Sequence, residues 1–142
     1  MVTIGINTGS TDRGIEKFKE IFELSSRKER AIYARIRYIT SQGIDFDTNA
    51  LNYPLVIFTT DNKAFALADV TAGFGGTGPH GMIEVLNYLG FEFDEKEILE
   101  HKEIVQLDLI KPDVKIEVNQ EYLKFYLDPF YYASSPFDIF TK

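Results

Sequence analysis

The residues best suited to bind a ligand form a glycine-rich turn at Thr71–Gly81, TAGFGGTGPHG. Five of the chain's 10 glycines lie in these eleven residues, which makes the turn unusual within the chain. Glycine lets the backbone adopt positive φ and approach a bound group closely. The unpaired amides at the start of the next helix would face that group with the positive end of the helix dipole. The turn is therefore predicted to hold a phosphate or carboxylate.

Side chains in this turn could add to the anion site. The Thr77 hydroxyl could donate to the anion, and so could the His80 imidazole, which donates more strongly when protonated. The Phe74 ring could stack on a base. The glycine spacing from Gly73 to Gly78 is that of the dinucleotide fingerprint, but a hairpin is expected before it instead of a βαβ unit, and no lysine follows as in a P-loop. The alternative is a tight strand-to-helix connection that needs glycine only for its geometry. The predicted ligand-binding residues here are Gly73, Phe74, Gly75, Gly76, Thr77, Gly78 and His80.

A second turn of small residues, Asn7–Thr11, also leads into an expected helix. Its hydroxyls and backbone amides lie next to Arg13, and a guanidinium makes strong hydrogen bonds to phosphate or carboxylate. We predict that Ser10, Thr11 and Arg13 contribute to anion binding. The alternative is an ordinary capped helix start, because serine and threonine are favoured N-cap residues.

The sequence contains few other residues suited to catalysis or metal binding. The chain has no cysteine, which excludes disulfides, thiolate catalysis and cysteine-ligated metals. His80 and His101 are the only histidines, and the pair Asp45 and Asp47 lacks the later carboxylate of a calcium loop. We predict no metal site, no cofactor and no catalytic residue, so a hydrolase or transferase ranks last among the functions considered.

The charge is unevenly distributed. Residues 1–40 hold eight Lys or Arg against five Asp or Glu, whereas residues 41–142 hold seven against 17. Most of the surface would therefore repel duplex nucleic acid, which is not expected as a partner. The basic first segment could still serve a local anion site. The acidic remainder could instead attract a basic protein, as in an inhibitor or immunity-type module.

These features favour a non-enzymatic protein that binds a small anionic ligand, in particular a nucleotide or nucleotide-derived signal, as a sensor or a sequestering protein. The alternative is the acidic protein-binding module. The first residues do not resemble a signal peptide, and no apolar segment approaches the ~20 residues needed to cross a bilayer. We therefore expect a cytoplasmic protein without a membrane partner.

Periodicity and turn residues predict the order of the elements. Helices are expected at residues 12–24, after the glycine-rich turn, and more briefly at 94–102. Strict alternation over residues 30–39 favours a strand with Arg35 and Arg37 on the outer face, and a helix is the alternative. Further strands are expected at residues 2–6, 55–60, 64–70, 104–110, 114–118 and 122–127.

Strands outnumber helices, and short turns join the later strands. This pattern predicts an α+β fold, a mainly antiparallel sheet with two principal helices packed against it. At 142 residues the chain fits a single domain spanning 1–142. Residues 128–142 form an aromatic tail that we expect to pack on the body or on a neighbouring subunit of a homo-oligomer.

Overall fold

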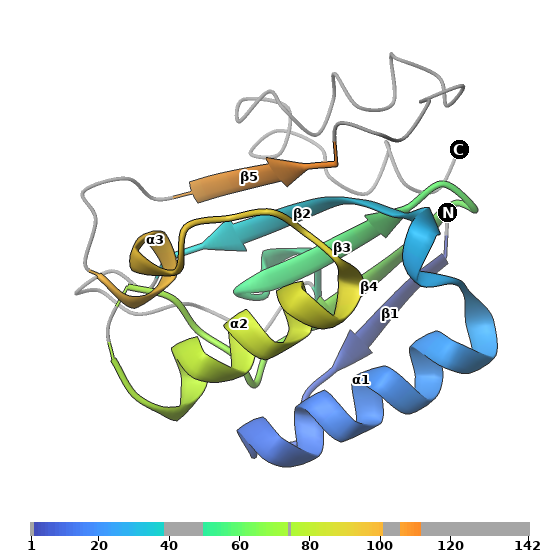
Figure 1. Cartoon of the computed structure of the whole chain (residues 1–142). Coiled ribbons are helices and arrows are strands. Elements are labelled where there is room, and N and C mark those ends of the chain that lie inside the picture. Colours follow the sequence, from blue (N-terminus) through green and yellow to red (C-terminus); the bar gives the residue numbers. More distant parts are fainter. Residues whose placement is uncertain (1, 39–49, 74, 101–105, 112–142) are drawn as a thin grey trace.

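The computed structural model describes residues 2–38, 50–73, 75–100 and 106–111. They form a mixed sheet in the order β1-β4-β3-β2-β5, with helices packed against it (Figure 1). The strands are β1 (Val2–Ile6), β2 (Ala31–Arg37), β3 (Leu55–Thr59), β4 (Lys63–Leu67) and β5 (Gln106–Ile110). The α-helices are α1 (Thr11–Ser25), α2 (Thr77–Leu89) and α3 (Glu95–Leu99), and the 3₁₀ helices are η1 (Lys28–Arg30) and η2 (Ala50–Asn52).

The sheet confirms the predicted α+β class and its mainly antiparallel character. Strand β2 pairs antiparallel with both β3 and β5, and β3 pairs antiparallel with β4 as the predicted hairpin. The hairpin turn contains Asn62 at a φ of 66°, a left-handed conformation that asparagine tolerates better than most residues. The exception is β1, which pairs parallel with β4 and lies at one edge of the sheet.

Helix α1 forms where the apolar periodicity predicted it. Ile15, Phe18 and Phe22 are buried against the sheet, while the residues between them are mostly exposed. Ser10 is the N-cap, and its side chain accepts a hydrogen bond from the amide of Arg13 at 3.5 Å. The phenyl rings of Phe18, Phe22 and Phe65 pack with centroids 5.0–6.0 Å apart, which joins α1 to β4.

Helix α2 follows the glycine-rich turn as predicted, and residues at both of its ends suit a helix terminus. Pro79 lies in its first turn, where the missing amide removes no hydrogen bond. Gly90 adopts the left-handed C-cap conformation with a φ of 82°. The amide of Phe91 donates to the carbonyl of Leu86 at 3.0 Å, which is a Schellman closure.

Residues 31–37 are a strand, which decides between the two interpretations of that segment. The expectation that both arginines lie on an outer face was wrong for Arg35, which is only 1% exposed. Helix η2 covers this face of the sheet, and the Arg35 guanidinium donates to the carbonyl of Leu51 and lies 5.6 Å from the ring of Phe58. Alternation alone cannot show that a second layer covers the polar side of a strand.

The main core lies between the sheet and the helices α1 and α2, which lie side by side across one face (Figure 1). Two contacts join these helices on their exposed side. Lys19 forms an ion pair with Glu84 at 3.4 Å, and the hydroxyl of Tyr88 donates to Glu23 at 2.7 Å. Partial burial and the hydrogen bond to the Glu23 carboxylate raise the pKa of Tyr88 to about 12.

Several predictions fall on residues outside the described ranges. These are the strands at residues 114–118 and 122–127, the tail at residues 128–142, Phe74, His101, and the pair Asp45 and Asp47. In the part of the chain that the structure describes, no helix combines the length and apolar character needed to span a bilayer.

Candidate functional site

Two backbone amides at the start of α2 have no hydrogen-bond acceptor among the described residues. Gly76 is the N-cap, with a φ of 123° and a ψ of −167°, and no side chain caps the helix. The amide of His80 donates to the carbonyl of Gly76 at 3.3 Å. Among the described residues, no carbonyl or side chain accepts from the amides of Thr77 and Gly78, as expected at a helix N-terminus. These two amides could bind an anion.

Other glycines of the turn serve packing. The amide of Gly73 donates to the carbonyl of Ile98 at 2.8 Å, and Gly73 is buried beside the ring of Tyr38. A Cβ on Gly78 would lie 2.1 Å from Oγ1 of Thr71. Gly75, in contrast, has open space around it and is exposed. The glycine cluster thus combines a structural requirement at Gly73 and Gly78 with an accessible stretch at Gly75 and Gly76.

Tyr38 supports the buried end of this turn. Its hydroxyl donates to the carbonyl of Glu97, which joins the end of β2 to α3. Burial raises the pKa of Tyr38, and the nearby Glu97 carboxylate raises it further. The phenol therefore remains neutral at physiological pH, where it acts as a hydrogen-bond donor.

The first turn is closed by an internal carboxylate. Oδ2 of Asp69 accepts from the amide of Thr8 at 2.8 Å and from its hydroxyl at 2.8 Å, and Oδ1 accepts from the amide of Gly9 at 3.0 Å. The hydroxyl of Thr11 donates to the carbonyl of Asp69 at 2.9 Å. A side chain of the protein therefore already holds two amides of the loop before α1, those of Thr8 and Gly9.

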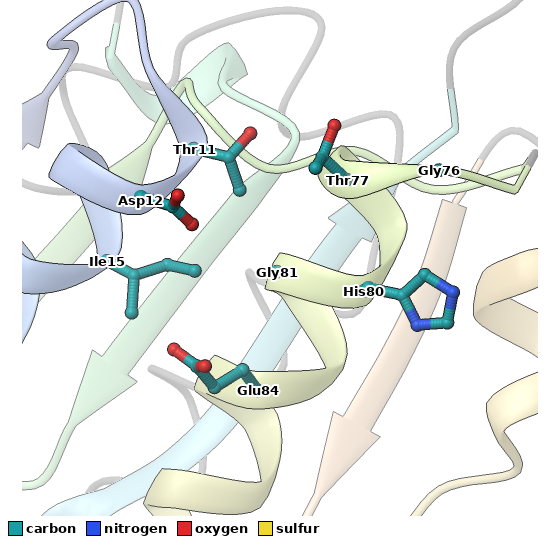
Figure 2. A pocket seen from close by; sticks show the side chains of 8 residues that line it. All are labelled: Thr11, Asp12, Ile15, Gly76, Thr77, His80, Gly81 and Glu84. Carbon is teal, nitrogen blue, oxygen red and sulfur yellow. The ribbon is translucent and has the colours of Figure 1, made fainter.

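A pocket of about 340 Å³ lies between the first turns of α1 and α2 (Figure 2). Figure 2 shows the hydroxyls of Thr11 and Thr77 at one end, and the Glu84 carboxylate further along α2 on the side facing α1. A Cβ on Gly81 would lie 2.5 Å from Cγ2 of Thr11, so the missing side chain allows the close approach of the two helices. The lining residues are Thr11, Asp12, Ile15, Gly76, Thr77, His80, Gly81 and Glu84.

The structure brings together parts of both predicted turns. Thr11 from the first turn and Gly76 and Thr77 from the second line one pocket. His80 also lines it, but its ring projects away from α1 in Figure 2. Ser10 is committed to capping α1.

The remaining predicted site residues lie elsewhere. Gly73, Gly75 and Gly78 belong to the turn but do not line the pocket, and Arg13 is exposed outside it. Phe74 lies outside the described residues.

Sequence reasoning did not select two carboxylates of the pocket. Asp12 lies in the first turn of α1, and Glu84 follows Thr77 by seven residues on α2. That spacing places Thr77, Gly81 and Glu84 on one helix face, which was a usable signal. Because Lys19 pairs with Glu84, the Asp12 carboxylate is the pocket's main negative charge without a described cationic partner.

The arrangement can bind two kinds of group at once. The amides of Thr77 and Gly78 and the Thr77 hydroxyl suit an anion, helped by the positive ends of two helix dipoles. The Asp12 carboxylate suits an N–H donor or a cationic group. Among the described residues there is no cluster of three or more His, Asp or Glu side chains that could hold a metal ion.

Comparison of the chain with protein-family models, with curated proteins and with solved structures finds no match in any of the three. The class is therefore defined by architecture alone, an α+β protein with a mixed sheet and a pocket between two helix N-termini on one face.

Proposed function

We propose that the pocket between α1 and α2 binds a small phosphorylated ligand that also carries N–H donors, as a nucleotide or nucleotide-derived signal does. The observation that carries the proposal is the convergence of Thr11, Gly76 and Thr77 on one pocket. Its volume of about 340 Å³ falls in the usual range of small-molecule sites.

The two sides of the pocket, Asp12 on α1 and Thr77 on α2, suggest how such a ligand is oriented. A phosphate would accept from the amide and the hydroxyl of Thr77, which lines the pocket at the start of α2. The Asp12 carboxylate would accept from an amino or ring N–H group of a base. Because an anion placed against Asp12 would be repelled, this orientation is preferred over its reverse.

The proposal requires binding without chemical turnover, so the protein would act as a sensor or would sequester the ligand. The hydroxyl of Thr11 already donates to the Asp69 carbonyl and so is not an activated nucleophile. Thr77 has no described base as a hydrogen-bond partner.

The test is a thermal-shift and calorimetric screen of the full chain against linear and cyclic nucleotides, the matching nucleosides, and inorganic phosphate. A phosphorylated ligand should raise the melting temperature, whereas its nucleoside should have little effect. Thr77→Val should weaken binding about tenfold, since it removes one hydrogen bond to a charged group. The matched control, Thr60→Val, lies outside the pocket and should bind normally.

A second variant tests the α1 side of the pocket. Asp12→Asn should reduce the preference among bases while retaining the affinity for the phosphate. Equal shifts for nucleosides and nucleotides, or no shift for any compound, would contradict the proposal. Conversion of the nucleotide to a product would replace the binding role with an enzymatic one.

The acidic surface supports the alternative of a basic protein partner. Glu92, Asp94, Glu95 and Glu100 are all exposed around α3. Acidic surfaces of this kind accelerate association with basic proteins. Reversing Glu92 and Glu95 to lysine would abolish such an interaction without affecting the pocket, which separates the two functions.

A further inference from the structure

Strand β1 exposes hydrogen-bonding groups along one edge of the sheet. Its other edge pairs with β4, where the amide of Val2 donates to Asn62 and the amide of Ala68 donates to Ile6. Because successive residues of a strand direct their backbone groups to opposite edges, Thr3 and Gly5 face away from β4. Both residues are exposed, and no described residue accepts from or donates to these outward groups.

Within the described residues, this edge lacks several of the features that usually prevent pairing. Its sequence, VTIGI, contains no charge and no proline, and its register with β4 shows no bulge. Natural edge strands are commonly protected by such devices. Val2 is 58% exposed, so apolar surface accompanies the open backbone groups.

The flank of α1 above this edge continues the apolar surface. Ile21 and Leu24 are three residues apart and share a helix face, and Leu24 is 85% exposed. This face lies on the far side of α1 from Glu23, which contacts α2. The end of α1 adjoins β1, because Lys63, the register partner of Val2, donates to the carbonyl of Ser25.

We infer that β1 is a homodimer interface at which a second copy of this chain adds its own β1 antiparallel across a two-fold axis at Ile4. In this register Thr3 lies opposite Gly5 of the second copy, and each of the two symmetric pairs exchanges both backbone hydrogen bonds. All outward groups of Thr3 and Gly5 are then satisfied, and the two sheets become continuous. This interface uses β1 and residues of α1 that do not line the pocket, so it does not depend on the proposed ligand site.

The charges on α1 favour a second copy as the occupant. Lys17 and Glu20 lie 4.0 Å apart near the middle of the helix, and both side chains are more than half exposed. The two-fold axis places the two α1 helices antiparallel, so Lys17 of one copy approaches Glu20 of the other. The strand itself contributes no charge that would repel its copy.

Cross-linking of single-cysteine variants tests the register without background, because the chain has no cysteine. Ile4→Cys should form a disulfide-linked dimer under mild oxidation, since residues opposite each other at a non-hydrogen-bonded site have Cα atoms about 4.5 Å apart. The matched control is Val2→Cys on the same face of β1. It should not cross-link, because about 13 Å of strand would separate it from its own copy.

Sedimentation velocity of the full chain tests the dimer itself. The wild-type protein should dimerise, and Thr3→Pro should weaken the dimer at least tenfold because it removes an outward amide, a change that edge strands tolerate. Leu24→Glu, at an exposed position, provides a second variant should Thr3→Pro fail to fold. Ile110→Glu on the opposite edge strand β5 is the control and should leave the dimer intact.

A monomeric wild-type protein, or a dimer unchanged by both Thr3→Pro and Leu24→Glu, would overturn the inference. Equal cross-linking of Ile4→Cys and Val2→Cys would also overturn it, because it would show contact without the stated register. A dimer that is lost in both edge variants and retained in the β5 variant supports it.

Discussion

The turns that begin α1 and α2 are built from similar residues but differ in how their amides are satisfied. At the first turn, Asp69 accepts from the amides of Thr8 and Gly9. At the second, no described residue accepts from the amides of Thr77 and Gly78. An internal carboxylate thus occupies the loop before α1, while Thr77 at the start of α2 lines a pocket. The residues of a turn define its capacity to bind an anion, and a distant side chain decides whether that capacity remains available.

Removing the internal carboxylate should have the largest effect on this comparison. Asp69→Ala should lower the free energy of unfolding by about 3 kcal/mol, because hydrogen bonds to a charged acceptor are lost at two amides and one hydroxyl. Urea denaturation measures the loss. Glu16→Ala, at an exposed residue of α1, is the control and should change stability by less than about 0.5 kcal/mol.

The same variant should make the first turn resemble the second. Inorganic phosphate should then raise the melting temperature of Asp69→Ala more than that of the wild-type protein, since the freed amides can donate to an external anion. An equal response in both proteins would show that the first turn cannot accommodate a free anion.

Alanine substitutions at two neighbouring glycines should show which of them the backbone conformation of the second turn requires. Gly76→Ala should destabilise the protein by about 1–3 kcal/mol, because a φ of 123° with a ψ of −167° is accessible to glycine almost alone. Gly75→Ala should be nearly neutral, since nothing lies within 4 Å of its added Cβ. Similar losses in both variants, measured by urea denaturation, would refute this assignment.

One substitution at each turn should separate an effect on stability from an effect on ligand affinity. Ser10→Ala should lower the free energy of unfolding by about 1 kcal/mol, because it removes the N-cap acceptor of α1. It should not change ligand affinity, whereas Thr77→Val should change affinity with little effect on stability. Calorimetric titration beside thermal denaturation of both variants distinguishes the outcomes. Weaker ligand binding in a folded Ser10→Ala protein would place the first turn in the binding site.

The smallest effect concerns Tyr88, which makes one of the two contacts that join α1 and α2 on their exposed side. Tyr88→Phe should cost about 0.5 kcal/mol at neutral pH, for loss of a surface hydrogen bond to Glu23. With its pKa raised to about 12 in the folded protein, Tyr88 contributes stability that is complete below pH 10. That contribution is lost as the pH rises from about 10 to about 12. The free energy of unfolding, measured by denaturation across this range, should therefore fall less with pH for Tyr88→Phe than for the wild-type protein.

Local signals predicted the elements that local interactions stabilise. The cap at Ser10 and the C-cap at Gly90 depend on residues within one helical turn, so α1 and α2 were predicted closely. The burial of Arg35 was missed because it depends on Leu51, which is 16 residues away in the sequence.

The candidate site was predictable only in part for the same reason. Thr77 and Thr11 could be selected separately by residue type, but nothing near either one indicates that they share a pocket. The carboxylate of Asp69 closes a turn 60 and 61 residues before it. The residue types of Thr8–Thr11 do not reveal such a partner, so open and occupied anion sites look alike in the sequence.

The short segment that leaves β4 serves both helix starts. Asp69 holds Thr8 and Gly9, and two residues later the amide of Thr71 donates to the carbonyl of Gly78 at 3.2 Å. Because this segment is hydrogen-bonded to both helix starts, we expect a displacement at the beginning of one helix to reach the other. Ligand binding at the start of α2 should therefore slow hydrogen exchange at the amides of Thr8 and Gly9. These amides lie outside the pocket, so their exchange reports on ligand binding from a distance.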